Sequence, residues 1–255
     1  MNDNDVSRLV PLTELDYTVV DVETTGFTPA DCHITEIGAV RVHDGQVVAE
    51  FSSLVNPGTP VPGNIEALTG IGDAMLAGAP AVAAVLPGLL AFAEGSVLAA
   101  HNARFDLSFL TAACEGAGLP WPSFAVIDTV QLARYLMVVP DEVPDCKLGT
   151  LAEFFGTLVQ PSHRALADAR ATAGVLTRLT DRLAGRGITT LDELAPWLTE
   201  QAAAQEAARA REALRVAAVE AAAQEAARGR ARAAKLARWP RWLRWLPSAA
   251  RWPSR

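Results

Sequence analysis

The sequence predicts a mixed α/β domain followed by a long, basic, Ala/Arg-rich helical tail. Three observations support this fold class: β-rich runs with a hairpin come first, strand-like and helical segments then alternate as far as Gly185, and the composition changes from residue 200 onward. We therefore expect four segments: an N-terminal arm (1–14), a mixed-sheet domain (15–185), a short linker or helix (186–199) and the basic helical tail (200–255), whose end is rich in Trp and Arg.

The first part of the chain has the pattern of strands and turns. Residues 17–22 form an apolar run typical of a buried strand, and residues 34–55 alternate in the manner of a β-hairpin. The Asp-Gly dipeptide at 44–45 lies between the two arms of that hairpin and favours a tight turn. A Pro/Gly-rich loop is expected over 56–64, and the short helix after it ends at Gly70.

Strands and helices alternate in the middle of the chain. A helix that contains Pro87 is expected over 80–95, and a strand over 96–102 leads into an amphipathic helix over 103–118. Another strand is expected over 124–129. Further helices are expected over 130–137, 147–156 and 165–185.

The charge is divided unevenly along the chain. The formal net charge is −7, but residues 201–255 contain 12 Lys/Arg against 4 Asp/Glu, whereas residues 1–200 contain 10 against 25. Opposite charges in the two parts indicate two functional regions. An acidic body does not exclude a nucleic-acid substrate, because bound metal ions reverse the local field where acids cluster.

Cysteine usage and hydropathy indicate the compartment. Cys32, Cys114 and Cys146 have no paired spacing, which argues against a disulfide framework or a structural zinc site and favours a reducing environment. The acidic N-terminus does not resemble a signal peptide. The apolar stretch at 79–93 is broken by prolines and is too short to span a bilayer. We therefore expect a cytoplasmic protein.

Two acids occur inside an apolar, strand-like run. Asp21 and Glu23 are two residues apart, so on a strand they face the same side, about 6.5–7 Å apart along the chain. Two carboxylates on one face of a central strand suit one or two hard cations. Taken alone, the pair is more typical of exposed acids on an edge strand. The Thr24-Thr25-Gly26 turn that follows offers backbone N–H groups and a hydroxyl to an anion.

Two later motifs place further acids near helix starts. Asn102 is a good N-cap residue, and Asp106 falls in the first turns of the helix after it, either as a metal ligand or as an acid stabilised by the helix dipole. His163 precedes Asp168 by five residues, and on one continuous helix the two would lie about 140° apart. The two side chains converge if His163 lies at or before the helix start; a solvated surface histidine is the alternative.

The ordered motifs D-x-E, N-x-x-F-D and H-x-x-x-x-D resemble those of the DEDDh 3′-5′ exonucleases. This DnaQ-like family includes the proofreading epsilon subunit of bacterial DNA polymerase III. The resemblance covers about residues 15–185, and the segment 54–80 also looks like that of the bacterial members. It implies a ribonuclease H-like mixed sheet flanked by helices in an exonuclease domain. It further implies a catalytic set in which four acids bind metal and His163 is the general base: Asp21, Glu23, Asp106, Asp168 and His163.

The cofactor that the resemblance implies is a pair of divalent cations, Mg²⁺ or Mn²⁺. Four carboxylates at one site repel one another strongly unless cations lie between them. Oxygen-only ligation favours Mg²⁺ or Mn²⁺ over zinc. Two such ions hold a scissile phosphate, activate a water and stabilise the leaving 3′ oxygen. An imidazole is suited to take the proton of that water near neutral pH.

The resemblance also implies contacts with the 3′-terminal nucleotide. We expect these contacts from Thr24, Thr25, Gly26, Phe27, Leu68, Thr69, Asn102 and Phe105. For Leu68 and Phe105, ordinary core packing is the alternative. A frayed 3′ end suits apolar contacts of this kind, because stacking on them is indifferent to base sequence.

Three functions are open at this stage. The leading one is a metal-dependent 3′-5′ exonuclease that releases nucleoside monophosphates from single-stranded DNA in proofreading or repair. The second is an exoribonuclease of the same fold, and the third is a non-catalytic module that binds nucleic acid or a partner. The presence of all five motif residues argues against the third.

The tail at 200–255 has several interpretations. Its Arg-rich composition suits nucleic-acid phosphates, its Trp/Leu/Arg end suits a membrane surface, and either part suits a protein partner. A solvated helix or a disordered end without a fixed role is the remaining alternative. No sliding-clamp peptide or polymerase domain is visible, so the sequence carries no motif for association with a replicative polymerase.

Overall fold

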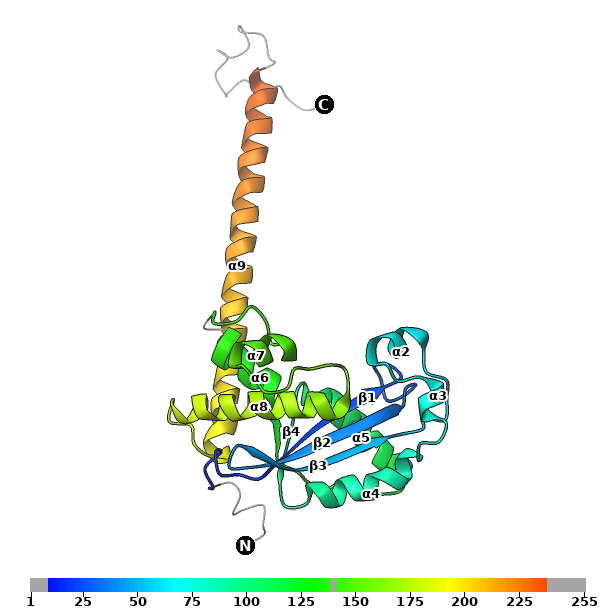
Figure 1. Cartoon of the computed structure of the whole chain (residues 1–255). Helices are drawn as coiled ribbons and strands as arrows, with labels where there is room; N and C mark the ends of the chain where they lie inside the picture. Colours follow the sequence, from blue (N-terminus) through cyan, green and yellow to red (C-terminus); the bar gives the residue numbers. More distant parts are fainter. Residues whose placement is uncertain (1–8, 139–140, 238–255) are drawn as a thin grey trace. The chain divides into compact units, whose positions relative to one another are not determined.

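The computed structural model describes residues 9–138 and 141–237 and divides the chain into two compact units, Met1–Thr199 and Glu200–Arg255 (Figure 1). The first unit contains the whole sheet and its covering helices. The Trp/Arg-rich end of the predicted tail, 238–255, and the first eight residues of the predicted arm lie outside the described residues.

A five-stranded mixed sheet forms the centre of the first unit. Its strands are β1 (Tyr17–Thr24), β2 (Ile34–His43), β3 (Gln46–Leu54), β4 (Val97–Ala100) and β5 (Val126–Asp128). The strand order is β3-β2-β1-β4-β5, with antiparallel β1/β2 and β2/β3 pairs and parallel β1/β4 and β4/β5 pairs. The predicted ribonuclease H-like mixed sheet is confirmed, although β4 and β5 are shorter than the predicted strands over 96–102 and 124–129.

The hairpin between β2 and β3 has the turn that its sequence favours. Asp44 and Gly45 both adopt positive φ values, 49° and 71°, as the two central residues of a type I′ turn require. Because the twist of this turn matches that of the flanking strands, a two-residue loop is sufficient to join them.

Helices follow the sheet strands closely in sequence. Their bounds are α2 (Gly63–Thr69), α3 (Asp73–Leu76), α4 (Val82–Ala93), α5 (Ala103–Gly116), α6 (Thr129–Ala133), the π-helix η1 (Arg134–Val138), α7 (Leu148–Phe155), α8 (Ala165–Ala184) and α9 (Leu191–Ala237). Helix α4 continues through Pro87, with Leu86 and Leu89 on either side of it buried. The single helix predicted over 130–137 is divided between α6 and η1; nothing in the structure explains the change of pitch.

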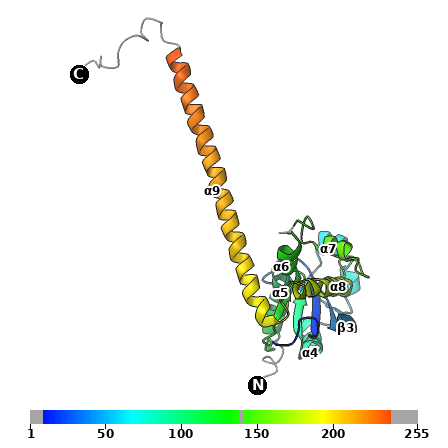
Figure 2. The same cartoon turned by 90° about the vertical axis from the view of Figure 1, so that its left-hand side faces the viewer.

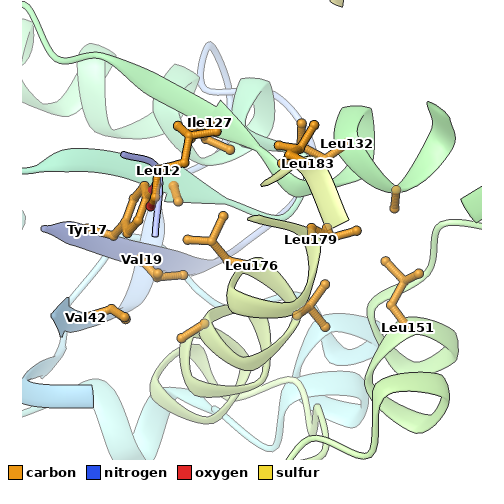
Figure 3. Close-up of a cluster of buried hydrophobic side chains, with 14 of the residues drawn as sticks. Leu12, Tyr17, Val19, Val42, Ile127, Leu132, Leu151, Leu176, Leu179 and Leu183 are labelled. Carbon is orange, nitrogen blue, oxygen red and sulfur yellow. The ribbon is translucent and has the colours of Figure 1, made fainter. Parts of the chain in front are cut away.

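Each face of the sheet carries its own hydrophobic core. On one face, Val19 of β1 and Val42 of β2 pack with a row of leucines from α8 (Figure 3). On the other face, Val20 and Val22 of β1 pack with residues of α4 and α5. Alternation along β1 therefore directs its odd-numbered side chains, including Asp21 and Glu23, to the face that α8 covers.

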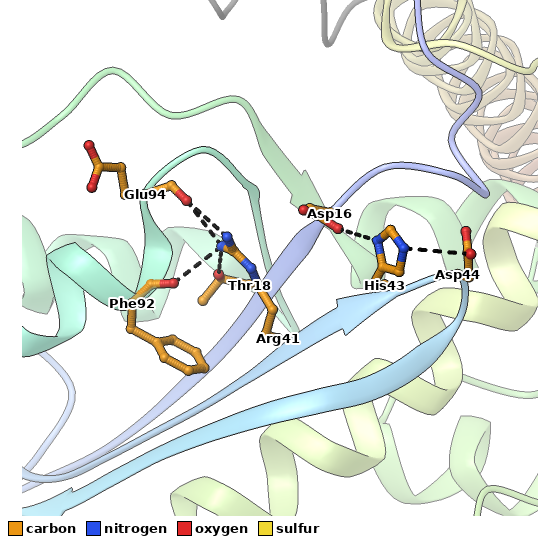
Figure 4. A network of polar contacts seen from close by, with 7 residues as sticks. All are labelled: Asp16, Thr18, Arg41, His43, Asp44, Phe92 and Glu94. Atoms are coloured by element: carbon orange, nitrogen blue, oxygen red, sulfur yellow. Dashed lines mark hydrogen bonds and ion pairs between the residues drawn. The ribbon is translucent and has the colours of Figure 1, made fainter.

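A polar network secures the end of α4 to the sheet. The guanidinium of Arg41 in β2 donates to the backbone oxygens of Phe92 and Glu94, at 3.0–3.2 Å, and so satisfies carbonyls that the helix end leaves without partners (Figure 4). Arg41 lies opposite Thr18 in the β1/β2 register, whereas Glu23 lies opposite Glu36. The network is thus at the end of β1 remote from its acids.

The segment 186–199, predicted as a short linker or helix, contributes to the first unit. Leu194 is buried in the core beside α8, and Trp197 packs against the same cluster. The backbone N–H of Leu12, in the predicted N-terminal arm, donates to Thr189 O at 2.6 Å. Helix α9 therefore begins at Leu191, within the first unit and nine residues before the predicted start of the tail at residue 200.

The second unit, as far as it is described, consists of the remainder of α9. Figure 2 shows α9 as one uninterrupted helix. The side chains described from Glu206 to Lys235 are exposed, and Glu212 accepts a bidentate pair of hydrogen bonds from Arg215 at 2.7 and 2.8 Å. Within the described residues, no helix is both long enough and apolar enough to cross a membrane.

Candidate active site

The two acids of β1 lie half-buried at the end of the strand. Burial raises the pKa of Asp21 well above its usual range, and the charges of Asp106 and Asp168 raise it further. Burial, followed by the charges of Asp168 and Glu36, raises the pKa of Glu23 to about 7, although Arg164 opposes the shift. Among the described residues, no hydrogen-bond donor compensates the burial of either carboxylate. Both carboxylates therefore favour the approach of a cation.

Asp106 joins this pair from the first turn of α5. Its side chain is buried, and its Oδ1 accepts a hydrogen bond from the backbone N–H of Val22 at 3.1 Å. Burial raises the pKa of Asp106, and the Val22 N–H opposes that rise. Because Val22 stands between Asp21 and Glu23 in sequence, this hydrogen bond fixes the third acid beside the first two.

Asn102 holds the start of α5 in a way that the sequence did not predict. It occupies the N-cap position, as predicted, but its side chain makes no capping hydrogen bond. Its backbone is left-handed, with φ 73°, and its N–H donates to Asp128 Oδ1 at 3.1 Å. The same oxygen accepts from Val130 N at 2.9 Å, so Asp128 joins the ends of β4 and β5.

The last two motif residues lie at the start of α8. The helix begins at Ala165, so His163 precedes it as predicted, exposed and left-handed with φ 56°. Asp168 is buried and accepts a hydrogen bond from Ser162 N at 2.7 Å. Burial raises the pKa of Asp168, while the Ser162 N–H and the charge of His163 lower it.

Three of the five predicted catalytic side chains converge closely. One ligand atom from each of Glu23, His163 and Asp168 lies within 4.8 Å of the others, and this is the one group of three or more potential metal ligands in the part of the chain that the structure describes. Asp21 and Asp106 are outside that group, but their charges interact with it. Asp168 and Glu23 raise the pKa of Asp21, and Glu23 raises the pKa of Asp106. The donor set is rich in carboxylate oxygen and deficient in positive charge, which fits hard divalent cations.

The sequence analysis missed one charged residue beside the site. Glu36 of β2 lies opposite Glu23 in the strand register and is 3% exposed. Its carboxylate receives the guanidinium of Arg164, the residue after His163. The sequence does carry a signal for Glu36, because it is an acid inside an apolar, strand-like run. The same feature indicated Asp21 as a candidate site residue.

The turn after β1 uses its polar groups internally. Thr24 Oγ1 donates to Gly26 O at 2.6 Å, and Thr25 N donates to His33 O at 2.8 Å. The Thr25 hydroxyl in turn accepts from His33 N at 2.9 Å. These contacts engage the hydroxyls of both threonines and the Thr25 N–H within the turn. Phe27, the next residue after the turn, is 80% exposed.

The other predicted substrate contacts divide into exposed and packed residues. Leu68 of α2 is 53% exposed, whereas Thr69 is buried and donates its hydroxyl to Ile65 O. Phe105 is half-buried, and its ring centroid lies 5.1 Å from that of Phe109 in the core. Asn102 is exposed. Core packing therefore accounts for Phe105 but not for Leu68.

Comparison with known proteins places the first unit in a family of exonucleases. The profile of the RNase_T family, described as Exonuclease, matches residues 18–176. A Mycobacterium tuberculosis protein named as a bifunctional exonuclease/endonuclease is 45% identical over 205 residues, which is 78% of this chain and 32% of that protein. A PolC-type DNA polymerase III of Caldanaerobacter subterraneus is 39% identical over 188 residues, 74% of this chain and 13% of the polymerase. The chain thus spans a third or less of the length of these relatives.

Solved structures share the fold. Exonuclease X in complex with 5′ overhanging duplex DNA has a TM-score of 0.53 and 29% identity, over 67% of this chain and 93% of that chain. Escherichia coli exonuclease I with a dT13 oligonucleotide has a TM-score of 0.59 and 17% identity, over 67% and 42%. A zinc-bound form of exonuclease I with single-stranded DNA has a TM-score of 0.57 and 19% identity, over 68% and 43%. At these lower identities the likeness to exonuclease I is one of fold.

Proposed function

Because the chain belongs to the DnaQ-like exonuclease family, we propose that it is a metal-dependent 3′-5′ exonuclease of the DEDDh type. It hydrolyses the 3′-terminal phosphodiester of single-stranded DNA and releases nucleoside monophosphates, in proofreading or repair. The observation that carries this proposal is the convergence of Glu23, His163 and Asp168 within 4.8 Å, beside Asp21 and Asp106.

Four carboxylates would hold two divalent cations, Mg²⁺ or Mn²⁺: Asp21, Glu23, Asp106 and Asp168. Their raised pKa values indicate that protein groups alone do not neutralise them. Bound cations of this kind supply an activated water and a stabilised leaving oxygen. The protein contributes the positions: the Val22 N–H fixes Asp106, and the Ser162 N–H fixes Asp168.

His163 is the general base in this proposal. The left-handed turn before α8 leaves its ring exposed, where it is accessible to a substrate water. The ring lies close to Glu23 and Asp168, two of the acids that would hold the cations. A general base at this distance from the acids removes the proton of the attacking water.

The substrate is a nucleic acid with a free 3′ end, and we favour DNA. Exonuclease X and exonuclease I were both solved with DNA, and the polymerase relatives are DNA polymerases. Phe27 and Leu68 present exposed apolar surface suited to stacking on a terminal base. Asn102 and the backbone of the Thr24–Gly26 turn are the polar candidates for contact with the strand. An exoribonuclease of the same fold is the second candidate.

The assay that tests this function uses 5′-labelled single-stranded DNA and RNA of one sequence. Purified protein is incubated with each strand in Mg²⁺, in Mn²⁺ and in EDTA, and a DNA with a blocked 3′ end serves as the polarity control. We expect a metal-dependent ladder of shortened DNA, little RNA loss and no digestion of the blocked strand. Digestion of RNA alone favours the exoribonuclease, and digestion of neither strand refutes the proposal.

A further inference from the structure

We propose that Glu36 and Arg164 are positioning residues, which hold the His163 turn and the start of α8 in register with β2. This inference rests on the function proposed above, because it assigns the pair to the placement of the general base. Neither residue belongs to the motif set, and neither is placed in contact with the nucleic acid.

The contacts between the two residues satisfy the whole Glu36 carboxylate. Arg164 Nη2 donates to Glu36 Oε1 at 2.7 Å, and Arg164 Nε donates to Oε2 at 3.1 Å. The backbone N–H of Ala165 donates to the same Oε2 at 2.8 Å. A bidentate arginine fork fixes orientation as well as distance. One buried carboxylate therefore binds both the side chain before α8 and the first amide of the helix.

A second observation shows that β2 is shaped to receive this segment. Gly38 is two residues beyond Glu36 and faces the same side of the strand. A Cβ atom on Gly38 would lie 2.2 Å from both Ala165 C and Leu166 N. The backbone of α8 thus rests directly on the backbone of β2 at the point where the arginine fork attaches. Together the two contacts fix the position of the helix start along the strand.

His163 is held between these anchors. On one side Ser162 N donates to Asp168, and on the other Arg164 is bound to Glu36. A histidine with φ 56° is unfavourable unless its surroundings impose that conformation. Because Glu36 lies opposite Glu23 in the strand register, the same pair also sets the distance between the His163 turn and the β1 acids.

The alternative is an ion pair that stabilises the fold and has no bearing on the site. The same helix offers a matched control for that alternative. Arg170 of α8 donates to Glu50 of β3 through Nε, at 2.7 Å, in a second bidentate pair between α8 and the sheet. The Glu50 side chain is more exposed than that of Glu36, 38% against 5%, and the pair is not attached to the His163 turn. A merely stabilising role predicts similar consequences when either pair is removed.

The variant that tests the proposal is Glu36→Gln/Arg164→Met. It removes both charges, so no buried charge is left unpaired, and the Gln oxygen still accepts the Ala165 N–H. Arg164→Lys is a second variant, which keeps the charge and loses the fork. Glu50→Gln/Arg170→Met is the control. The first readout is the nuclease rate with Mg²⁺ on labelled single-stranded DNA, and the second is amide hydrogen exchange over 162–166 in metal-free protein.

We expect the test variant to lose kcat by about 10²-fold, the scale of a misplacement of about 1 Å, with KM changed less than about threefold. Its amides at 162–166 exchange faster, Arg164→Lys is intermediate in both readouts, and the control retains wild-type values. Wild-type kcat in the folded test variant, unchanged exchange, or equal losses in the control overturn the proposal. If wild-type protein has no nuclease activity, the proposed function fails, while the exchange comparison still decides whether the pair holds the turn.

Discussion

At the scale of single residues, the acids of the site are placed where their charges are unfavourable. Burial raises the pKa of Asp21, Glu23, Asp106 and Asp168, and neighbouring carboxylates raise the pKa of Asp21 and Glu23 further. A fold under selection for stability alone would replace such a group with apolar residues. The proposed function explains the acids by the cations that they would bind, and their titration supplies a direct test.

The stability of the metal-free protein should fall as the pH rises. The pKa of Glu23 is raised from 4.5 to about 7, so the folded state holds this proton more tightly than the unfolded chain does. The stability that Glu23 contributes is then fully present below about pH 4.5 and is lost as the pH rises to about 7. Asp106, whose pKa is raised to about 8, extends the decline to higher pH. Thermal unfolding in EDTA at pH 5 and pH 8 measures the decline.

Two comparisons check the origin of that decline. Mg²⁺ should restore most of the stability lost at pH 8, because it binds the ionised acids of the folded state. Glu23→Gln should show a shallower pH dependence than wild type. A metal-free stability that rises between pH 5 and pH 8 would contradict the assigned charge states.

His163→Ala should reduce kcat by about 10²–10⁴-fold, the usual contribution of a general base. The fold should be retained because the ring is exposed, and Mg²⁺ binding should be retained because the four carboxylates remain. Steady-state kinetics and calorimetric titration with Mg²⁺ measure the two effects. His43→Ala is the control, since His43 is also exposed and lies at the other end of the sheet. A full nuclease rate in His163→Ala would refute the general-base role.

At the scale of elements, the site depends on how closely α8 approaches β2. Gly38 is the residue that permits this approach, because its missing Cβ would meet Ala165 and Leu166 backbone atoms at 2.2 Å. The neighbouring strand β1 presents Asp21 and Glu23 to the same face that α8 covers. The acids and the helix start are thus brought together by backbone packing as well as by charge.

Gly38→Ala should destabilise the protein by about 1–3 kcal/mol, because a methyl group there forces the helix start away from the strand. Urea unfolding monitored by circular dichroism measures the change. Gly63→Ala is the matched control, since a Cβ at Gly63, the first residue of α2, meets nothing within 4 Å. Equal stability of the two variants would show that α8 does not rest on β2 as described.

The sequence predicted most of the strands and helices of the first unit, but not the contacts that hold them. Alternation and the Asp-Gly turn predicted β1, β2 and β3, and helix geometry placed His163 before α8. Two features depend on residues distant in sequence: the left-handed Asn102, which is held by Asp128, and the carboxylate of Glu36, which is held by Arg164. The Thr24-Thr25-Gly26 turn was predicted to offer backbone N–H groups and a hydroxyl to an anion, but local bonds engage the Thr24 hydroxyl and the Thr25 N–H. Such partners are fixed by tertiary packing, so no local pattern in the sequence predicts them.

At the scale of the whole molecule, an acidic catalytic unit is followed by a basic segment. Residues 201–255 hold 12 of the 22 Lys/Arg residues, and the described part of this segment is an exposed helix. We propose that its cations bind nucleic-acid phosphates; a membrane surface or a protein partner is the alternative.

Deletion of 200–255 should weaken binding to single-stranded DNA and flatten its salt dependence, because fewer counterions are released per bound strand. Fluorescence anisotropy at several NaCl concentrations, with a metal-free buffer to prevent digestion, gives both quantities. The rate on short oligonucleotides at saturation should remain close to that of the full chain. Unchanged affinity and an unchanged salt slope would exclude nucleic acid as the partner of the tail.

In the proposed function, the acids of the site serve metal-dependent cleavage at a 3′ end. The most direct measurement compares wild type with Asp21→Asn, which is nearly isosteric, in the shortening of 5′-labelled single-stranded DNA with Mg²⁺. Wild type should shorten the strand from its 3′ end, and Asp21→Asn should be slower by more than about 10²-fold, since even residues that only support metal ligands cost 10–100-fold. Digestion by Asp21→Asn at the wild-type rate would contradict the account.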